Sequence, residues 1–262
     1  MCLVTFMKDV HPTYPFILVV NRDELYSRLA EPIHRWVDEP TVTAGIDLKE
    51  KGTWLGYTDE GKFIAVLNHP FTGWEPERIN PRSRGQLLRD YLTQEIPINE
   101  FNHYLQTTRL DYEGYHLLYG TFNDLNYYSN VANQFHAFPP GLHCLANTTD
   151  DLSKHRKDRS SEHLAQYVHA NKEELDLEEL TRLMQDNKKA KRIKEYPKEL
   201  EYETAKQNTS VFIRGEEFGT VGTTAILVDK QGNIHVREVK YDQKGITQVT
   251  TQEQTLNIKM SD

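Results

Sequence analysis

Strand-like segments come in pairs along this chain, and the pairing limits its fold more than any other feature. Residues 2–7 and 16–20 are β-rich runs joined by a loop with two prolines, which predicts an antiparallel hairpin. Residues 54–57 and 63–67 flank a turn that contains Gly61 and predict a second hairpin. Further strands are predicted at 115–121, 126–129, 141–146, 223–228 and 234–239.

Helices are predicted for the middle of the chain, where apolar residues recur at helical spacing over 87–92, 101–105, 164–168 and 177–184. Strands at both ends around central helix pairs favour the α+β class, with two antiparallel sheets covered by helices, over alternating βαβ units. The chain has 262 residues, enough for one sizeable core, so a single domain over 1–262 is expected.

Composition excludes several classes of function. The net charge of -8 argues against nucleic acid as the main partner, and the apolar runs are far shorter than the ~20 residues of a membrane span. The basic stretch 188–194 is interpreted as a solvated helix end or linker. No charged and apolar leader precedes the first strand, and the two cysteines make no disulfide framework, so a cytoplasmic protein is predicted. The sequence has no zinc-ligand spacing and no Gly-rich phosphate loop, so no metal or nucleotide cofactor is expected.

Cys2 directly follows the initiator methionine. Because cysteine is small, the processing peptidase is expected to remove Met1 and leave a free α-amine on a nucleophilic residue. An α-amine with a pKa near ~8 can act as the general base for its own thiol, so no separate histidine is required. The structural alternative is that Cys2 is the first buried residue of an edge strand.

A polar cluster, Asn21-Arg22-Asp23-Glu24, follows the second predicted strand directly. If the extended geometry continues, Asn21 and Asp23 share one face of the sheet, while Arg22 and Glu24 share the other. A carboxylate near Cys2 could hold the α-amine, and a guanidinium could favour the thiolate. The alternative is a surface Arg–Asp pair at a turn, which contributes little stability.

Two asparagines end apolar strands: Asn68 follows the run 63–67, and Asn147 follows the run 144–146. Their amides can donate hydrogen bonds to a developing oxyanion, as acyl transfer through a cysteine requires. Asparagines at strand ends are also common turn formers. The segment 82–85 (Arg-Ser-Arg-Gly) at a predicted helix start could bind a carboxylate or phosphate, and a simple Ser83 N-cap explains it equally well.

Taken together, these motifs resemble the NRDE family, also called the transport-and-Golgi-organisation protein 2 family. Its members begin with Met-Cys and carry Asn-Arg-Asp-Glu after the second strand, as this chain does at 21–24. The resemblance covers nearly the whole chain. It includes Gly-Thr-Trp-Leu-Gly at 52–56, Arg-Ser-Arg-Gly at 82–85, Leu-Ala-Asn at 145–147, and Phe-Gly-Thr at 218–220 ahead of the strand 224–229.

The family in turn resembles the choloylglycine and penicillin V acylases, which are N-terminal-nucleophile (Ntn) hydrolases that cleave amide bonds with a cysteine. This resemblance implies four layers ordered αββα, with Cys2 as nucleophile and with Asn68 and Asn147 as the two oxyanion-side asparagines. The assisting arginine and aspartate of the acylases fall within 21–24, in a different order. A later acylase arginine has its nearest counterpart at Val221, where many relatives carry Arg, and this departure predicts a less cationic site.

Two functions from different classes follow from the resemblance. The leading hypothesis is an N-terminal-cysteine amidohydrolase acting on a small, partly apolar amide or acyl substrate through an acyl-enzyme. The alternative is a non-catalytic protein that uses the same pocket to bind or carry haem or acyl lipid, with haem as its only expected cofactor. A third interpretation is a metabolic scaffold whose Ntn pocket is vestigial.

Overall fold

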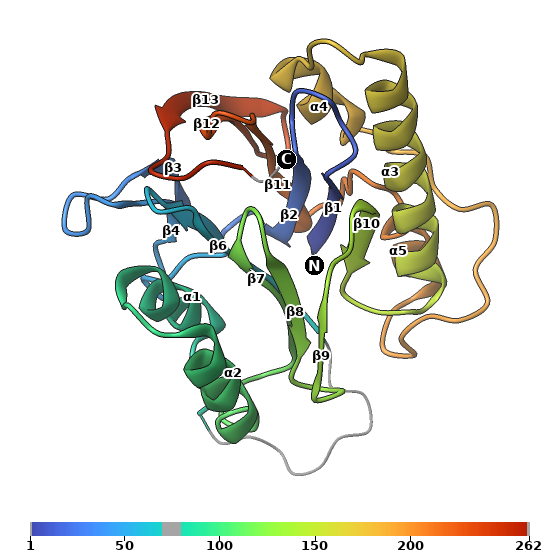
Figure 1. Cartoon of the computed structure of the whole chain (residues 1–262). Coiled ribbons are helices and arrows are strands. Elements are labelled where there is room, and N and C mark those ends of the chain that lie inside the picture. Colours follow the sequence, from blue (N-terminus) through green and yellow to red (C-terminus); the bar gives the residue numbers. More distant parts are fainter. Residues whose placement is uncertain (1, 70–79, 261–262) are drawn as a thin grey trace. The chain divides into compact units, whose positions relative to one another are not determined.

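The computed structural model describes residues 2–69 and 80–260, which divide into two compact units (Figure 1). The first unit comprises the chain up to Ser27 together with Pro139–Thr255 and Met260, and the second comprises Arg28–Phe138 together with Leu256–Lys259. Each unit has its own antiparallel sheet with helices against one face, which confirms the predicted α+β class. The single domain expected from chain length stays a prediction.

The first unit is built on a six-stranded sheet. Its elements are β1 (Cys2–Lys8), β2 (Phe16–Leu25), β10 (Gly141–Ala146), α3 (Asp151–Ala170), α4 (Leu177–Leu183), α5 (Tyr202–Gln207), β11 (Phe218–Val228), β12 (Asn233–Tyr241) and β13 (Ile246–Thr255). The strand order is β10-β1-β2-β11-β12-β13. The predicted hairpin supplies β1 and β2, and β2 also pairs with β11 from the far end of the chain. This pairing joins the two ends of the sequence in one sheet.

The second unit is built on a seven-stranded sheet whose strands follow one another in chain order, from β3 to β9. Its elements are β3 (Ala30–Arg35), β4 (Val42–Asp47), β5 (Leu55–Thr58), β6 (Lys62–Asn68), α1 (Arg84–Thr93), α2 (Ile98–Thr107), β7 (Tyr115–Thr121), β8 (Leu125–Ser129) and β9 (Gln134–Ala137). Because most neighbours are joined by short turns, this sheet depends on local pairing far more than the first one does.

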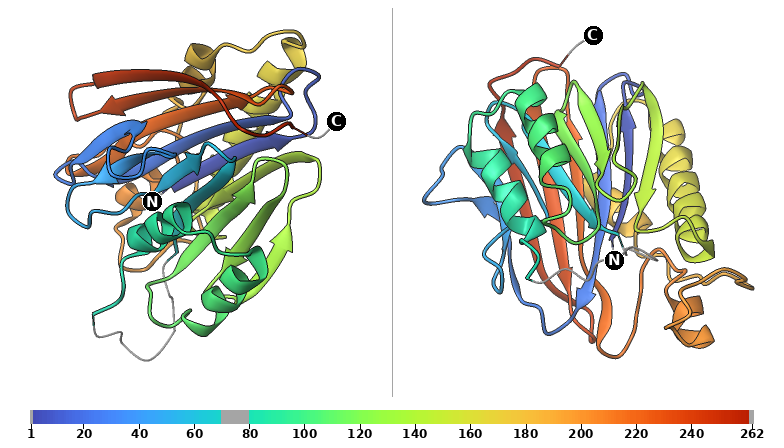
Figure 2. Two further views of the ribbon diagram at one scale, coloured as in Figure 1. Left: turned by 60° about the vertical axis from the view of Figure 1, so that its left-hand side comes forward. Right: turned by 90° about the horizontal axis from the view of Figure 1, so that it is seen from below.

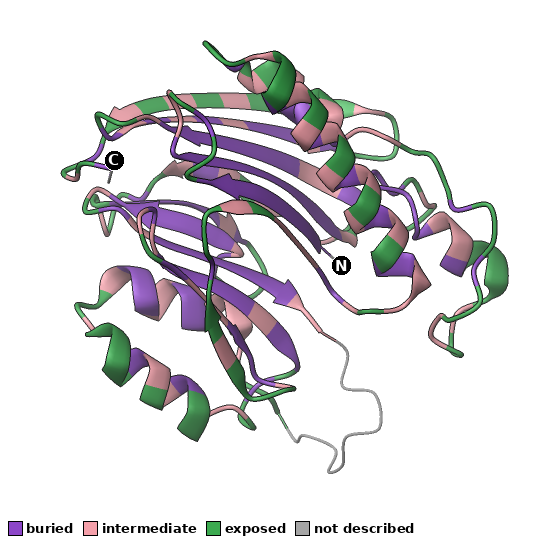
Figure 3. Ribbon diagram, turned by 45° about the vertical axis from the view of Figure 1, so that its right-hand side comes forward, coloured by how far each residue is buried: buried purple, intermediate pink, exposed green. Residues whose placement is uncertain are grey.

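The two sheets carry different cores on their helix-covered faces. In the first unit, α3 and α4 cover an aliphatic cluster that includes Leu3, Val19 and Ala225. In the second unit, α1 covers an aromatic cluster that includes Tyr91 and Tyr119. The inward faces of the helices are buried and their outer faces are exposed, and β13 is the most exposed strand of its sheet (Figure 3; Figure 2 gives two further views of the ribbon).

Every predicted strand and helix is present in the structure, several of them longer than expected. The sequence does not predict β3, β4, β9, β13 or α5. The strand β13 is missed because its sequence, from Ile246 to Thr255, is dominated by Thr and Gln and has no apolar alternation. An edge strand needs no such alternation, because it is exposed along most of its length.

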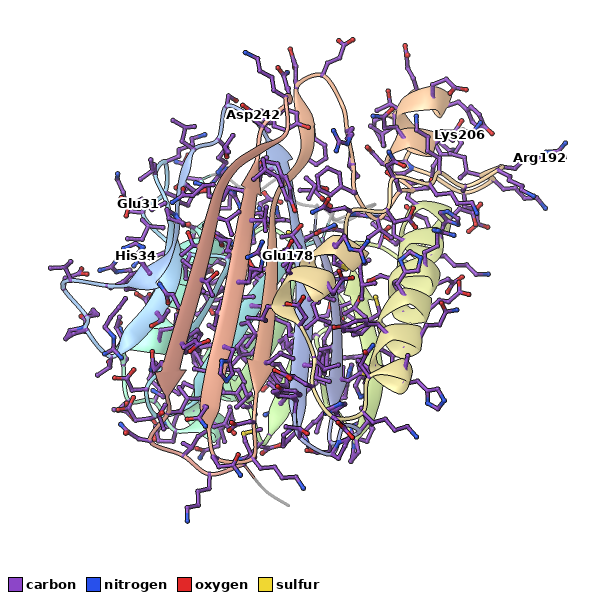
Figure 4. All side chains as sticks on the ribbon, turned by 90° about the horizontal axis from the view of Figure 1, so that it is seen from above. Glu31, His34, Glu178, Arg192, Lys206 and Asp242 are labelled. Atoms are coloured by element: carbon purple, nitrogen blue, oxygen red, sulfur yellow. The ribbon has the colours of Figure 1, made fainter. Side chains whose placement is uncertain are left out.

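Two sequence alternatives are decided by local structure. The Ser83 side chain caps α1 by accepting a hydrogen bond from the main-chain N–H of Gln86, so the N-cap interpretation of 82–85 is confirmed. The basic stretch 188–194 lies in the irregular segment between α4 and α5, with Arg192 at its outer end (Figure 4). Within the described residues, no helix is both long and apolar enough to cross a membrane.

Candidate active site

Strand pairing gives Cys2 its neighbours at one end of the six-stranded sheet. Cys2 begins β1, where it lies opposite Arg22 of β2. On the other side of β1, Leu3 pairs with Ala146 of β10, so Asn147 comes directly beside Cys2 at the end of that strand. The register of three strands therefore brings together residues that are distant in the sequence.

The main-chain nitrogen of Cys2 donates a hydrogen bond to Oδ1 of Asn147 over 2.6 Å. Both residues are buried, with exposed fractions of 8% and 2%. In a chain that has lost Met1, this nitrogen is the α-amine, and the Asn147 amide oxygen would hold it next to the thiol. Met1 lies outside the described residues, so its removal stays a prediction.

The electrostatic environment of the Cys2 thiol is mixed. Burial raises the pKa of the thiol, and the nearby Asp23 carboxylate raises it further. The main-chain N–H of Asp23, which hydrogen-bonds to the sulfur, and the guanidinium of Arg22 both lower the pKa. Burial is the largest of these influences, so the protonated thiol is favoured and a base is needed to generate the nucleophile.

The Asn21–Glu24 motif divides its side chains between the two faces of the sheet, as strand alternation predicts. Arg22 lies opposite Cys2 and shares its face. Asn21 and Asp23 point to the other face, where α3 supplies the partner of Asp23. The motif therefore acts on the thiol with its arginine and on the helix layer with its asparagine and aspartate.

Two side chains outside the predicted site hold Asp23. Nη2 of Arg156 donates to Oδ2 of Asp23 over 2.6 Å, and Oγ1 of Thr220 donates to Oδ1 over 2.6 Å. The exposed fractions of Arg156 and Asp23 are 2% and 1%. Loss of either member would leave an uncompensated buried charge. The ion pair therefore ties the position of the Asp23 side chain to that of Arg156.

Arg156 could have been found from the spacing of its neighbours on α3. Apart from Ser153, the buried residues of this helix recur every four positions, as Leu152, Arg156, Ser160, Leu164 and Val168. A charged residue inside an otherwise inward-facing stripe indicates a buried partner. Thr220 lies in the Phe-Gly-Thr motif at 218–220, but nothing in that motif indicates Asp23, 197 positions away, as its partner.

Asn21 makes three hydrogen bonds to protein atoms. Its Nδ2 donates to the main-chain oxygens of Met184 and Val211, both at 2.9 Å, and its Oδ1 accepts from Oγ1 of Thr223 at 2.7 Å. These bonds satisfy the amide at zero exposure, so the contacts observed for Asn21 fasten the segments at 184 and 211 to the sheet.

Glu24 and Val221 lie next to this cluster on β2 and β11. Glu24 is half-buried, and its Oε1 accepts a hydrogen bond from the main-chain N–H of Leu25. Val221 is the extra residue of a β-bulge, because Thr220 pairs with Asp23 whereas Gly222 pairs with Arg22. The bulge places Val221 two strands from Cys2, beside the strand that carries the motif.

Asn68 belongs to the second unit, where it ends β6 opposite Tyr115 of β7. Its assignment as an oxyanion donor stays a prediction. The other cysteine, Cys144, lies on β10, and its Sγ is 3.0 Å from Oγ1 of Thr5. Within the described residues, no group of three or more His, Cys, Asp or Glu side chains is placed to hold a metal ion.

Comparison with known families then identifies the chain. The model of the family described as "Transport and Golgi organisation 2" matches residues 1–243, which include every site residue predicted from the sequence. The chain belongs to this family. The resemblance seen in its scattered motifs is thereby confirmed over nearly the whole length.

Curated members of the transport and Golgi organisation 2 family match over a smaller part of their length. The human "Transport and Golgi organization protein 2 homolog" is 35% identical over 105 residues, covering 37% of this chain and 36% of its own. The mouse homologue is 30% identical over 125 residues, covering 45% and 44%. The matched part thus spans well under half of the length of these relatives.

Solved structures support the Ntn-hydrolase-like fold of this family member. Two variants of the conjugated bile acid hydrolase from Clostridium perfringens match with TM-scores of 0.54 and 0.53. Both matches cover 100% of each chain, at 12% and 11% sequence identity. Identity this low shows the fold alone.

Proposed function

We propose that this protein is an N-terminal-cysteine amidohydrolase that acts on a small, partly apolar amide or acyl substrate in the cytoplasm. The observation that carries the proposal is the hydrogen bond from the Cys2 main-chain nitrogen to Asn147. This bond holds the nitrogen that becomes the α-amine once Met1 is removed. Because the same residue bears the thiol, nucleophile and base lie together at one buried position.

The reaction would begin with transfer of the Cys2 thiol proton to the α-amine. The thiolate then attacks the amide carbonyl, and the resulting oxyanion is stabilised by the asparagine amides of Asn68 and Asn147. Collapse of the tetrahedral intermediate breaks the C–N bond, and the leaving amine takes its proton from the α-ammonium. A water molecule, deprotonated by the α-amine, hydrolyses the thioester and regenerates Cys2.

The charges around Cys2 fit this sequence of steps. A buried thiol with a raised pKa is unreactive until a base removes its proton, and an α-amine with a pKa near ~8 is suited to that task at neutral pH. Arg22 lies opposite Cys2 on the same face, where it favours the thiolate. The ion pair with Arg156 holds the side chain of Asp23, whose main-chain N–H hydrogen-bonds to the sulfur.

The first test is the state of the N-terminus. Intact-mass measurement of untagged protein should show loss of one methionine, because the processing peptidase accepts a small second residue. Complete retention of Met1 would contradict the proposal, since the Cys2 nitrogen would then be an amide that cannot accept the thiol proton.

The second test is turnover of a panel of amides by processed protein, with Cys2→Ala and Cys144→Ala as a matched pair. Cys2→Ala should abolish hydrolysis and Cys144→Ala should retain it, because Cys144 contacts Thr5 and not the Cys2 nitrogen. Equal activity of both variants would exclude Cys2 as nucleophile. Haem titration by absorbance belongs in the same assay, since haem binding without amide turnover would support the carrier function instead.

A further inference from the structure

A cavity of about 950 Å³ opens beside α5 in the first unit, near the helix on which Figure 4 labels Lys206. One wall consists of α5 and its C-cap residue Asn208, and another consists of the loop 214–218, which leads into β11. Lys189 and Leu200, from the segment that precedes α5, also line the cavity. All of its lining residues belong to the first unit, so the cavity is a feature of that unit alone.

The cavity lies on the opposite face of the six-stranded sheet from the Cys2 thiol. Phe218, which lines the cavity, and Thr220 project to one face of β11, because they are two residues apart in a strand. Thr220 reaches Asp23 on the helix-covered face, whereas Cys2 shares the other face with Arg22. The cavity is therefore separate from the candidate active site.

Local contacts hold the walls of the cavity in place. A Cβ at Gly215 would lie 2.4 Å from the main-chain oxygen of Phe218, so the loop turns too tightly to accept a side chain there. Nζ of Lys189 donates a hydrogen bond to Oε1 of Gln207 over 3.0 Å, which ties the preceding segment to α5. The shape of the cavity is thus formed by the fold before any ligand binds.

Asn208 differs from the other buried asparagines of the described chain. The side chains of Asn21, Asn130 and Asn147 all form hydrogen bonds to protein atoms. Asn208 is only 7% exposed, yet its side chain has no hydrogen-bond partner within residues 2–69 and 80–260. Neither atom of its amide is among the fully buried polar atoms that lack a partner, so the amide keeps its access to the cavity. A buried amide without a partner costs free energy, and a ligand in the cavity would supply the missing bonds.

The rest of the lining favours a neutral ligand with an apolar part. Leu200 and Phe218 are half-buried and present apolar surface to the cavity. Five charged residues of the lining are all exposed, and three carboxylates oppose two cations, so their net charge is only -1. Exposed charges that nearly cancel attract an ionic ligand weakly. These residues are Lys189, Glu203, Arg214, Glu216 and Glu217.

We propose that this cavity binds a small neutral amide with an apolar substituent. The Asn208 side chain offers an acceptor and two N–H donors, which match the N–H and the carbonyl of an amide. The apolar substituent would pack on Leu200 and Phe218, in a cavity whose volume is within the usual range for small-molecule sites. This binding is distinct from hydrolysis at Cys2 and takes place whether or not the thiol reacts.

The test uses N-benzylacetamide, a neutral amide with a phenyl group, titrated into the whole protein and followed by main-chain NMR shifts. Residues 203–208 and 214–218 should shift together and reach saturation, because the probe contacts both walls. Benzyl acetate has nearly the same shape but an ester oxygen in place of the N–H. It should bind roughly two- to tenfold more weakly, as expected for the loss of one hydrogen bond. Cys2→Ala should leave both affinities unchanged, since the thiol lies on the other face.

Asn208→Leu removes the amide and keeps the approximate volume of the side chain. It should weaken binding of N-benzylacetamide roughly fivefold or more, because two hydrogen bonds to the ligand are lost. The free energy of unfolding, measured in urea, should not fall, because the amide makes no bond within the described protein. Asn208→Ala, which removes the amide without filling the cavity, should weaken binding as well and separates lost hydrogen bonds from steric blockage. Asn187→Leu is the matched control, since Asn187 is an exposed asparagine of the segment before α5 that does not line the cavity, and its affinity should equal that of wild type.

Equal affinity of wild type and Asn208→Ala for N-benzylacetamide would overturn the proposal. Equal binding of the ester and the amide would also overturn it, because the cavity would then recognise apolar surface alone. Shifts confined to residues outside the cavity, or no saturable shifts, would show that the cavity does not bind an amide.

Discussion

The helix-covered faces of the two sheets bury different kinds of side chain. Under α1 and α2 the core is aromatic, with Tyr91, Phe101 and Tyr119 in mutual ring contact. Under α3 and α4 an aliphatic core adjoins a buried polar network formed by Asp23 and Arg156. The first core depends on area and shape, and the second depends also on directed bonds between specific atoms.

The difference matters because the loss of a buried hydrogen bond or ion pair is costly to stability. An aromatic core tolerates the loss of one hydroxyl, since most of its stability comes from apolar area. A buried ion pair contributes little net stability compared with an apolar equivalent, but it is costly to break once present. The pair with Arg156 therefore matters for the position of Asp23 beside Cys2.

The largest expected effect is that of Arg156→Met. It should lower the free energy of unfolding by about 3–5 kcal/mol, because it leaves Asp23 buried without its counter-ion. Arg159→Met on the same helix removes a more exposed ion pair with Asp186 and should cost about 1 kcal/mol. Urea unfolding measures both variants. Equal decreases in the free energy of unfolding would show that breaking the Asp23–Arg156 pair costs no more than breaking a more exposed ion pair.

The next effect compares two buried asparagines with matching bonds. Asn130 in the second unit donates to the main-chain oxygens of Arg109 and Glu113 and accepts from Tyr115, much as Asn21 fastens three groups in the first unit. Asn21→Ala and Asn130→Ala should each cost about 2–3 kcal/mol, since both leave buried main-chain groups unsatisfied. Chemical denaturation of the pair tests this. A negligible cost for Asn21→Ala would remove the case for a structural role of the motif asparagine.

A smaller effect is expected from Val221→Arg, which adds a cation at the bulge beside the motif. A positive charge near Cys2 should lower the pKa of the thiol and speed alkylation at neutral pH by roughly threefold to tenfold. Val221→Met serves as a control of similar bulk without charge. If the arginine variant keeps the wild-type pH profile of alkylation, residue 221 does not act on the thiol.

The smallest effect is expected from Tyr115→Phe in the aromatic core. The Tyr115 hydroxyl is buried without a hydrogen-bond partner among the described residues, so its removal should change stability by less than about 0.5 kcal/mol near pH 7. Burial raises the pKa of Tyr115, so the folded state holds the phenol proton more tightly than the unfolded state does. Wild type should therefore lose stability as pH rises above about 10, and the variant should lose less. Unfolding at about pH 8 and about pH 11 would reveal this difference, and equal alkaline losses in the two proteins would contradict it.

The sequence by itself determined the local elements and the chemistry at their ends. Two β-rich runs on either side of a proline-containing loop were enough to predict the β1–β2 hairpin, and side chains of a strand project to opposite faces in a fixed period. The same rule placed Arg22 on one face and Asp23 on the other, and the Met-Cys start together with the strand-end Asn147 marked the site. The family and the α+β class followed from those features.

Only the tertiary structure decided which distant residues meet. Pairing of β2 with β11 brings Thr220 to Asp23, and it aligns Arg22 with Gly222 and Lys240 in one row. No short window of sequence contains this register, since it depends on where the whole of β11 docks and on a bulge that shifts it by one residue. The local sequence therefore determines which side chains each strand carries on each face. Long-range strand pairing determines which distant residues those side chains meet.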